Sequence, residues 1–70
     1  MKKKIKIKIN GKLKIIEDKT KLSVFLKYNK IPLSKVAIEL NRNIVDKKKI
    51  NKIFLRANDK IEIVHFIGGG

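Results

Sequence analysis

Few side chains in this 70-residue sequence have the type and spacing needed for acid–base, nucleophilic or metal chemistry. The single histidine, His65, has no support in the sequence for a triad with Ser23 or Ser34. Cysteine is absent, which excludes disulfides, thiolate metal sites and cysteine nucleophiles. We therefore expect that the chain is not an enzyme and that it has no bound cofactor and no metal site. The carboxylates show no paired spacing: Glu17, Asp18, Glu39, Asp46, Asp59 and Glu62.

The group left with useful chemistry is the backbone carboxylate after Gly68, Gly69 and Gly70. Glycine is the costliest residue to order, so such a run adds nothing to folding. Three extended residues span up to about 10 Å, and without Cβ atoms they can thread a channel that a side chain would block. A partner enzyme with ATP can adenylate the Gly70 carboxylate, which a sulfur or nitrogen nucleophile then attacks. A frayed end is the alternative interpretation.

The charge raises the question of an anionic partner, because 19 Lys+Arg against 6 Asp+Glu give a net charge of +13. Only Arg42 and Arg56 are arginine, the residue that reads bases and forks onto phosphates. Aromatic residues that could stack on bases are few, and the lysines are spread along the chain. A solvated basic surface and an anionic partner both remain open. In the second case an acidic protein is more economical than nucleic acid.

The chain contains no apolar run of the roughly 20 residues that a membrane-spanning helix needs. In the opening MKKKIKIKIN, lysine alternates with isoleucine, so the apolar core of a signal peptide is missing. We expect a cytoplasmic protein that does not bind membranes and is monomeric when free.

Residues 3–9 alternate lysine and isoleucine, the period of a half-buried strand whose isoleucines face the core. Asn10-Gly11 follows, a strong signal for a two-residue hairpin turn. The second strand is predicted over residues 12–17, with Leu13 and Ile15 facing inward. The chain therefore opens with a β-hairpin.

The next segment changes to a helical period, with Leu22, Phe25 and Leu26 on one face. We predict a helix over residues 21–29, with Thr20 as its N-cap. A third strand is expected over 36–41, a tight turn at 41–43, and a short fourth strand at 44–45. A covered loop with a helical turn after Asp46 and a last strand over 60–67 complete the chain.

The closing strand has aliphatic residues on both faces and should pair centrally, parallel to the first strand. That places a mixed sheet of four to five strands under one main helix, an α+β ubiquitin-like β-grasp. We expect a β-grasp domain over residues 1–67 and a flexible glycine tail over 68–70. Val64 and Phe66 lie on the strand face opposite Ile61 and Ile63. These two side chains either pack against the loop at 50–55 or form an exposed patch for a partner.

The segments VAIELNRNIV and NDKIEIVHFIGGG resemble the ThiS sulfur carrier proteins of thiamin biosynthesis, most strongly over residues 36–45 and 58–70. The resemblance implies that an E1-like, ATP-using enzyme of the ThiF type adenylates Gly70. A sulfur donor protein then converts the adenylate to a thiocarboxylate, which delivers sulfur to a thiazole synthase of the ThiG type.

On this interpretation Gly70 is the reacting residue. The residues expected to bind the partners are Gly69, Gly68, Ile67, Phe66 and Val64. The same ending would also suit a carrier for molybdopterin, for the tungsten cofactor or for tRNA thiolation. The high charge keeps open a basic nucleic-acid-binding module of unrelated function.

Overall fold

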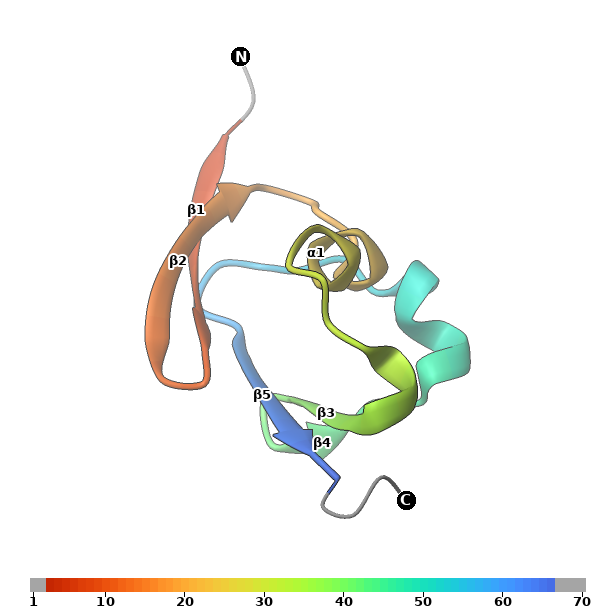
Figure 1. The fold of residues 1–70 in the computed structure, drawn as a ribbon. Helices are drawn as coiled ribbons and strands as arrows, with labels where there is room; N and C mark the ends of the chain where they lie inside the picture. Colours follow the sequence, from red (N-terminus) through yellow and green to blue (C-terminus); the bar gives the residue numbers. More distant parts are fainter. Residues whose placement is uncertain (1–2, 67–70) are drawn as a thin grey trace.

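The computed structural model describes residues 3–66 and contains one mixed sheet with the strand order β2-β1-β5-β3-β4 (Figure 1). One α-helix, α1 (Leu22–Tyr28), is accompanied by two 3-10 segments, η1 (Leu33–Lys35) and η2 (Lys47–Lys52). This α+β arrangement confirms the predicted β-grasp fold. The strands are β1 (Lys4–Ile9), β2 (Lys12–Glu17), β3 (Val36–Leu40), β4 (Asn43–Ile44) and β5 (Lys60–His65).

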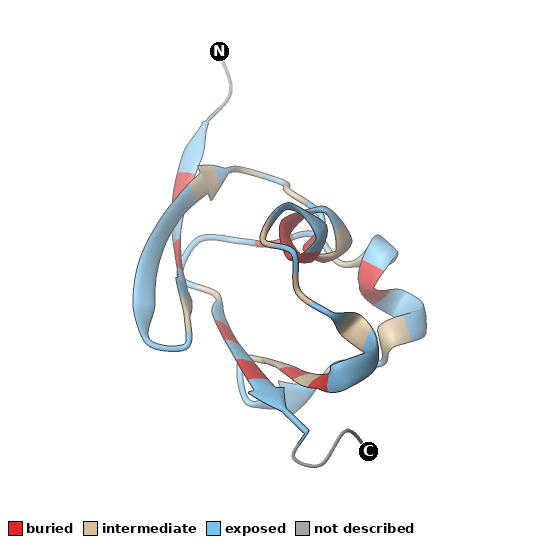
Figure 2. Cartoon of the chain, viewed as in Figure 1, coloured by how far each residue is buried: buried red, intermediate tan, exposed pale blue. Residues whose placement is uncertain are grey.

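The first and last strands lie side by side at the centre of the sheet, as predicted. β1 pairs with β5 in parallel, and β5 pairs with β3 in the antiparallel direction. One face of the sheet packs against α1 and η2, and Figure 2 shows the buried positions alternating along the central strands. Within residues 3–66 no helical segment packs on the opposite face, which we call the outer face. The buried core consists of Ile5, Ile7, Leu22, Phe25, Leu26, Val36, Ile38, Ile50, Leu55, Ile61 and Ile63.

The hairpin forms where it was predicted, but the inward face of β2 was predicted wrongly. Asn10 and Gly11 both have positive φ, so the turn contains two residues and Ile9 pairs with Lys12. Residues opposite each other share a face, and this register puts Leu13 and Ile15 beside lysines of β1 on the outer face. They are 58% and 61% exposed, and it is Ile16 that packs against the core.

The helix starts one residue later than predicted, and Thr20 does not cap it. Lys21 is the N-cap residue and makes no side-chain cap bond, whereas Thr20 Oγ1 donates to the Glu17 carbonyl at 2.7 Å. The Leu22 N–H donates instead to the Ile53 carbonyl at 2.8 Å. A backbone group distant in sequence therefore satisfies a helix-end donor that the prediction had assigned to a local side chain.

The second half of the chain follows the predicted order with small shifts. Asn41 and Arg42 adopt positive φ in the turn before β4, which begins one residue earlier than expected. The Asp46 carboxylate accepts the Lys48 N–H at 2.9 Å at the start of η2, where a helical turn was predicted after Asp46. β5 ends at His65, and Ile67, the predicted last residue of the strand, lies outside the described residues. No helix within residues 3–66 has the length and apolar character needed to cross a membrane.

Candidate functional site

The end of β5 is fixed to the sheet up to the last described residue. His65 pairs with Val36, and the Phe66 N–H donates to the Lys35 carbonyl at 2.9 Å. The last described residue, Phe66, is therefore held beside the start of β3. The predicted tail residues follow directly but lie outside the described residues: Ile67, Gly68, Gly69 and Gly70.

The hairpin turn also holds β5, through a contact that sequence reasoning missed. The Asn10 side-chain oxygen accepts the Ile63 N–H at 2.7 Å, and the Asn10 N–H donates to the Ile61 carbonyl at 2.8 Å. β1 and β5 pair only at Lys8–Lys60 and Ile9–Ile61. The side-chain oxygen of Asn10 therefore adds one more hydrogen bond between the hairpin and β5, beyond the last backbone pair. The Asn-Gly pattern gives the turn but not this second role.

Val64 and Phe66 are not buried against the loop at 50–55. Val64 is 52% exposed and lies opposite Ala37, while Phe66 is 47% exposed. The ammonium group of Lys47 in η2 lies 5.4 Å from the centre of the Phe66 ring. A cation over an aromatic face at this distance is attractive and helps to orient the ring. The structure thus leaves both side chains accessible at the end of the described residues, and their role in binding stays a prediction.

Beside Val64 the outer face has apolar groups around two carboxylates. Glu39 lies opposite Glu62 on β5 and opposite Ile44 on β4, and Ile44 is 77% exposed. Like charges directly opposite each other in a sheet are destabilising, so folding alone does not favour this pair. We call this surface the tail-proximal patch: Ala37, Glu39, Ile44, Glu62 and Val64.

The other acidic residues described above show no catalytic arrangement. The three aspartates accept backbone N–H bonds in turns, from Lys19 to Asp18, from Lys48 to Asp46, and from Arg56 to Asp59. The structure does bring two scattered carboxylates together, Glu39 and Glu62, but they lie on the sheet surface. His65 is exposed at the end of β5.

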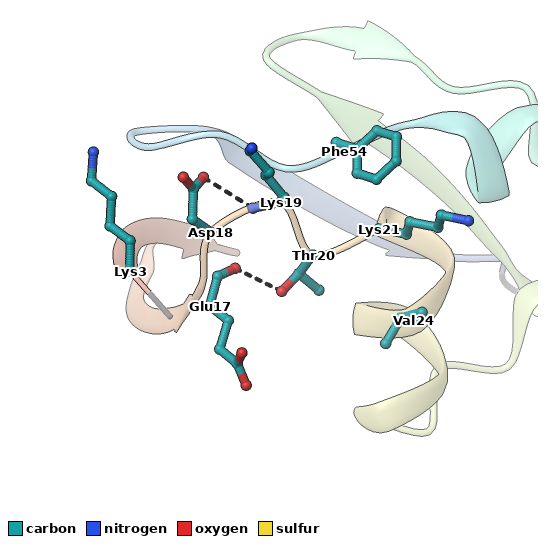
Figure 3. Close-up of a pocket in the computed structure, with 8 residues that line it drawn as sticks. All are labelled: Lys3, Glu17, Asp18, Lys19, Thr20, Lys21, Val24 and Phe54. Atoms are coloured by element: carbon teal, nitrogen blue, oxygen red, sulfur yellow. Dashed lines mark hydrogen bonds between the residues drawn. The ribbon is translucent and has the colours of Figure 1, made fainter. Parts of the chain in front are cut away.

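An open hollow of about 670 Å³ lies at the junction of β2 and α1 (Figure 3). Its polar groups hold the turn together, since Asp18 accepts the Lys19 N–H and Thr20 donates to the Glu17 carbonyl (Figure 3). β1 begins at this end of the sheet and runs parallel to β5, so the hollow lies at the opposite end from His65 (Figure 1). It is therefore separate from the site at the end of β5.

Residues 7–70 match the sequence profile of the ThiS family. A thiazole synthase from Magnetococcus marinus is 38% identical over 66 residues, covering 94% of this chain and 20% of that protein. The chain thus spans about a fifth of that relative. The sulfur carrier protein ThiS of Bacillus subtilis is 46% identical over 35 residues, covering 50% of this chain and 53% of that protein. The crystal structure of a thiamine biosynthesis protein (ThiS) from Geobacter metallireducens has the same fold, with a TM-score of 0.81, 22% identity, and coverage of 94% of this chain and 100% of that one.

Proposed function

The chain belongs to the ThiS family, and from this premise we propose that it is a cytoplasmic sulfur carrier for the synthesis of the thiamin thiazole. The reacting group is the carboxylate of Gly70. The chain acts as a protein co-substrate, and its partner enzymes supply the catalytic groups. The observation that carries the proposal is the match of the family profile to residues 7–70, which includes the three terminal glycines.

The proposed chemistry has two balanced steps. A carboxylate oxygen of Gly70 attacks the α-phosphorus of ATP bound to an E1-like adenylating enzyme, and pyrophosphate leaves. A sulfide-level sulfur nucleophile from a donor protein then attacks the carbonyl carbon, and AMP leaves with the oxygen. The product is a thiocarboxylate, whose sulfur replaces one carboxylate oxygen. Splitting one difficult substitution into two easier ones is the general advantage of an activated acyl intermediate.

The domain contributes a rigid origin for the tail. β5 is held on one side by β3 and on the other by the Asn10 side chain, up to the Phe66 N–H. From this anchor the glycines can carry the carboxylate about 10 Å at full extension. Holding the reacting group at a fixed reach from a docked body converts a bimolecular encounter into a positioned one.

The tail-proximal patch is the proposed docking surface for the activating enzyme. Val64 and Ile44 supply exposed apolar area, and Phe66, two residues after Val64 in the sequence, is also exposed. Exposed apolar side chains gathered on one face and rimmed by polar residues mark protein–protein interaction sites. Glu39 and Glu62 lie among these residues and favour a partner surface with basic side chains.

The thiazole branch is supported by the Magnetococcus marinus thiazole synthase, in which a segment similar to this chain is part of a much longer protein. We propose that a thiazole synthase receives the sulfur from this carrier. Pull-down of a purified thiazole synthase by the thiocarboxylate form would test this partner, with the unmodified carboxylate form as the control. Retention of a molybdopterin-type or tRNA-thiolating acceptor instead would assign the carrier to another pathway.

Release of pyrophosphate tests the first step directly. The chain is mixed with ATP and an E1-like adenylating enzyme of this family, and pyrophosphate is measured against time. The full chain should support release, whereas a variant without Gly69 and Gly70 should not, although it keeps the same unfolding midpoint. Equal release with the two chains would show that the Gly70 carboxylate is not the substrate.

A further inference from the structure

The outer face has a second patch on the side away from β3, made by the hairpin. The register places Lys6 opposite Ile15, and Lys8 opposite both Leu13 and Lys60. All of these side chains therefore share the face that does not pack against α1. We call this surface the lysine patch: Lys4, Lys6, Lys8, Leu13, Ile15 and Lys60.

The patch is hollowed at its centre. A cavity of about 190 Å³ is lined by Lys6, Ile7, Lys8, Leu13, Asn58 and Lys60. The Asn58 N–H donates to the Lys6 carbonyl at 2.7 Å, which ties the turn before β5 to β1 at this point. At roughly 30 Å³ for each water, the hollow has space for about six waters, or one side chain. Three of the residues that line the hollow are lysines.

The apolar residues of the lysine patch do not pack in the hydrophobic core. Leu13 and Ile15 are more than half exposed, and they lie on an edge strand that is exposed along most of its length (Figure 2). Single exposed hydrophobic residues are common, but these two are neighbours on one face, and the aliphatic stems of Lys6 and Lys8 extend the apolar strip. The opposed lysines Lys8 and Lys60 are destabilising in the free chain, as like charges across strands are.

We infer that the lysine patch is a docking surface for an acidic protein, which inserts a carboxylate side chain into the hollow and covers Leu13 and Ile15. Charge complementarity selects an anionic partner, because the charged residues that line the hollow are all lysines, namely Lys6, Lys8 and Lys60. Glu17 lies on the same face opposite Lys4 and does not line the hollow. Successive lysines on β1 are about 6.7 Å apart along the strand, the spacing of alternate side chains on an extended partner. This proposal does not depend on the chemistry of Gly70.

The composition of the patch favours protein over other anions. Arg42 and Arg56, the residues suited to phosphate forks and base edges, both lie outside it. The patch also contains none of the aromatic residues on which bases stack. A second copy of the chain would oppose lysine to lysine. An anionic lipid surface would also complement the charge of the patch. Proteins that bind lipid surfaces bury a larger apolar face than the two aliphatic residues of this patch provide.

In the test, a synthetic peptide of alternating glutamate and valine is titrated into the full chain. Binding is measured by the changes in the amide NMR chemical shifts of the chain. A thymidine oligonucleotide and phosphatidylserine vesicles are titrated in parallel. We expect saturable shifts from the peptide confined to β1, β2 and the turn at Asn58. The peptide should also bind more tightly than the oligonucleotide or the vesicles at about 0.1 M salt, where charges are screened beyond ~10 Å.

Matched variants separate a built surface from general basicity. Lys6→Glu with Lys8→Glu should weaken peptide binding about tenfold or more. Lys48→Glu with Lys49→Glu on η2 makes the same change in net charge and should have little effect. Leu13→Thr with Ile15→Thr leaves the charge unchanged and should weaken binding of the peptide only. Each variant is first shown to fold, with an unfolding midpoint no lower than that of the parent.

Three results would overturn the proposal. Equal losses of peptide affinity in the two double lysine variants would mean that the net charge alone accounts for binding. Shifts spread over lysines of all elements would mean that there is no patch. Tighter binding of the oligonucleotide or the vesicles at the same amides would assign the surface to that partner.

Discussion

The side chain of Asn10 and the backbone of Ile63 are 53 residues apart in sequence and are joined by a hydrogen bond of 2.7 Å. Asn10 therefore has two structural roles. It adopts the positive φ of the hairpin turn, and its side chain adds a hydrogen bond between the end of β1 and β5. The strand that leads to the glycine tail is thus held by the first turn of the chain.

Both roles of Asn10 should contribute to the free energy of unfolding, which replacement of this residue tests. Asn10→Ala leaves the partly buried Ile63 N–H without its acceptor and strains the turn. We expect a loss of about 2–4 kcal/mol in the free energy of unfolding, from an unmet donor and a left-handed alanine. Urea denaturation measures this loss. Asn10→Gly removes only the acceptor and should lose less. Equal stability of all three proteins would show that the Ile63 bond is unimportant.

The corrected face of β2 gives a second prediction. Ile7→Ala removes a side chain that is 1% exposed in the core and should cost about 2–5 kcal/mol. Ile15→Ala removes an outer-face side chain and should cost less than about 1 kcal/mol. Urea denaturation of the two variants compares the faces directly. A loss of stability for Ile15→Ala as large as that for Ile7→Ala would mean that Ile15 faces the core, and that the register of β2 is shifted by one residue.

The tail-proximal patch should control binding of the activating enzyme. Val64→Ser shortens an exposed side chain beside the tail and should raise the KM for the carrier about tenfold, the size of effect expected at the centre of an interface. Steady-state pyrophosphate release measures it. Val24→Ser makes the same change on α1, at a residue that is 56% exposed, and should leave KM unchanged. Similar values for both variants would move the docking surface elsewhere.

The high net charge should make stability depend on salt. With a net charge of +13, repulsion among lysines destabilises the compact state. Raising the salt concentration from about 0.01 M to 0.1 M shortens the screening length from ~30 Å to ~10 Å. The thermal unfolding midpoint should rise over this range, as recorded by circular dichroism. A midpoint that falls with salt would indicate that attractive ion pairs outweigh the repulsion.

Local patterns in the sequence were sufficient for most of the fold. The alternation of lysine and isoleucine gave β1, the Asn-Gly pair gave the hairpin, and the spacing of Leu22, Phe25 and Leu26 gave the helix. The central pairing of β5 followed from its apolar character on both faces. These features depend on period, turn chemistry and burial, all of which are local properties of the chain.

One error came from a distant group in place of a local one, and the other came from the register that the hairpin turn sets. Thr20 has the type of an N-cap, but the Ile53 carbonyl accepts the Leu22 N–H and the Thr20 hydroxyl is used in the preceding turn. The inward face of β2 was predicted from its apolar residues, although the two-residue turn had already paired Ile9 with Lys12. Turn geometry sets the register in a hairpin, and it prevails over the hydrophobic pattern of an edge strand.

The candidate site was only partly predictable from the sequence. Val64 and Phe66 could be placed at the end of a strand, but their exposure depended on what the loop at 50–55 covers. The pairing of Glu39 with Glu62 and with Ile44 requires the strand order, because these residues are far apart in the sequence. The same holds for the lysine patch, which joins β1, β2 and β5.

The central claim is that the carboxylate of Gly70 becomes a thiocarboxylate, and intact-mass spectrometry tests it most directly. The chain is incubated with the adenylating enzyme, ATP and a sulfur donor, and the mass is compared with a sample that lacks ATP. Replacement of one oxygen by sulfur should add about 16 Da, located by fragmentation at Gly70. An unchanged mass, with an adenylating enzyme shown to be active on another carrier, would contradict the claim.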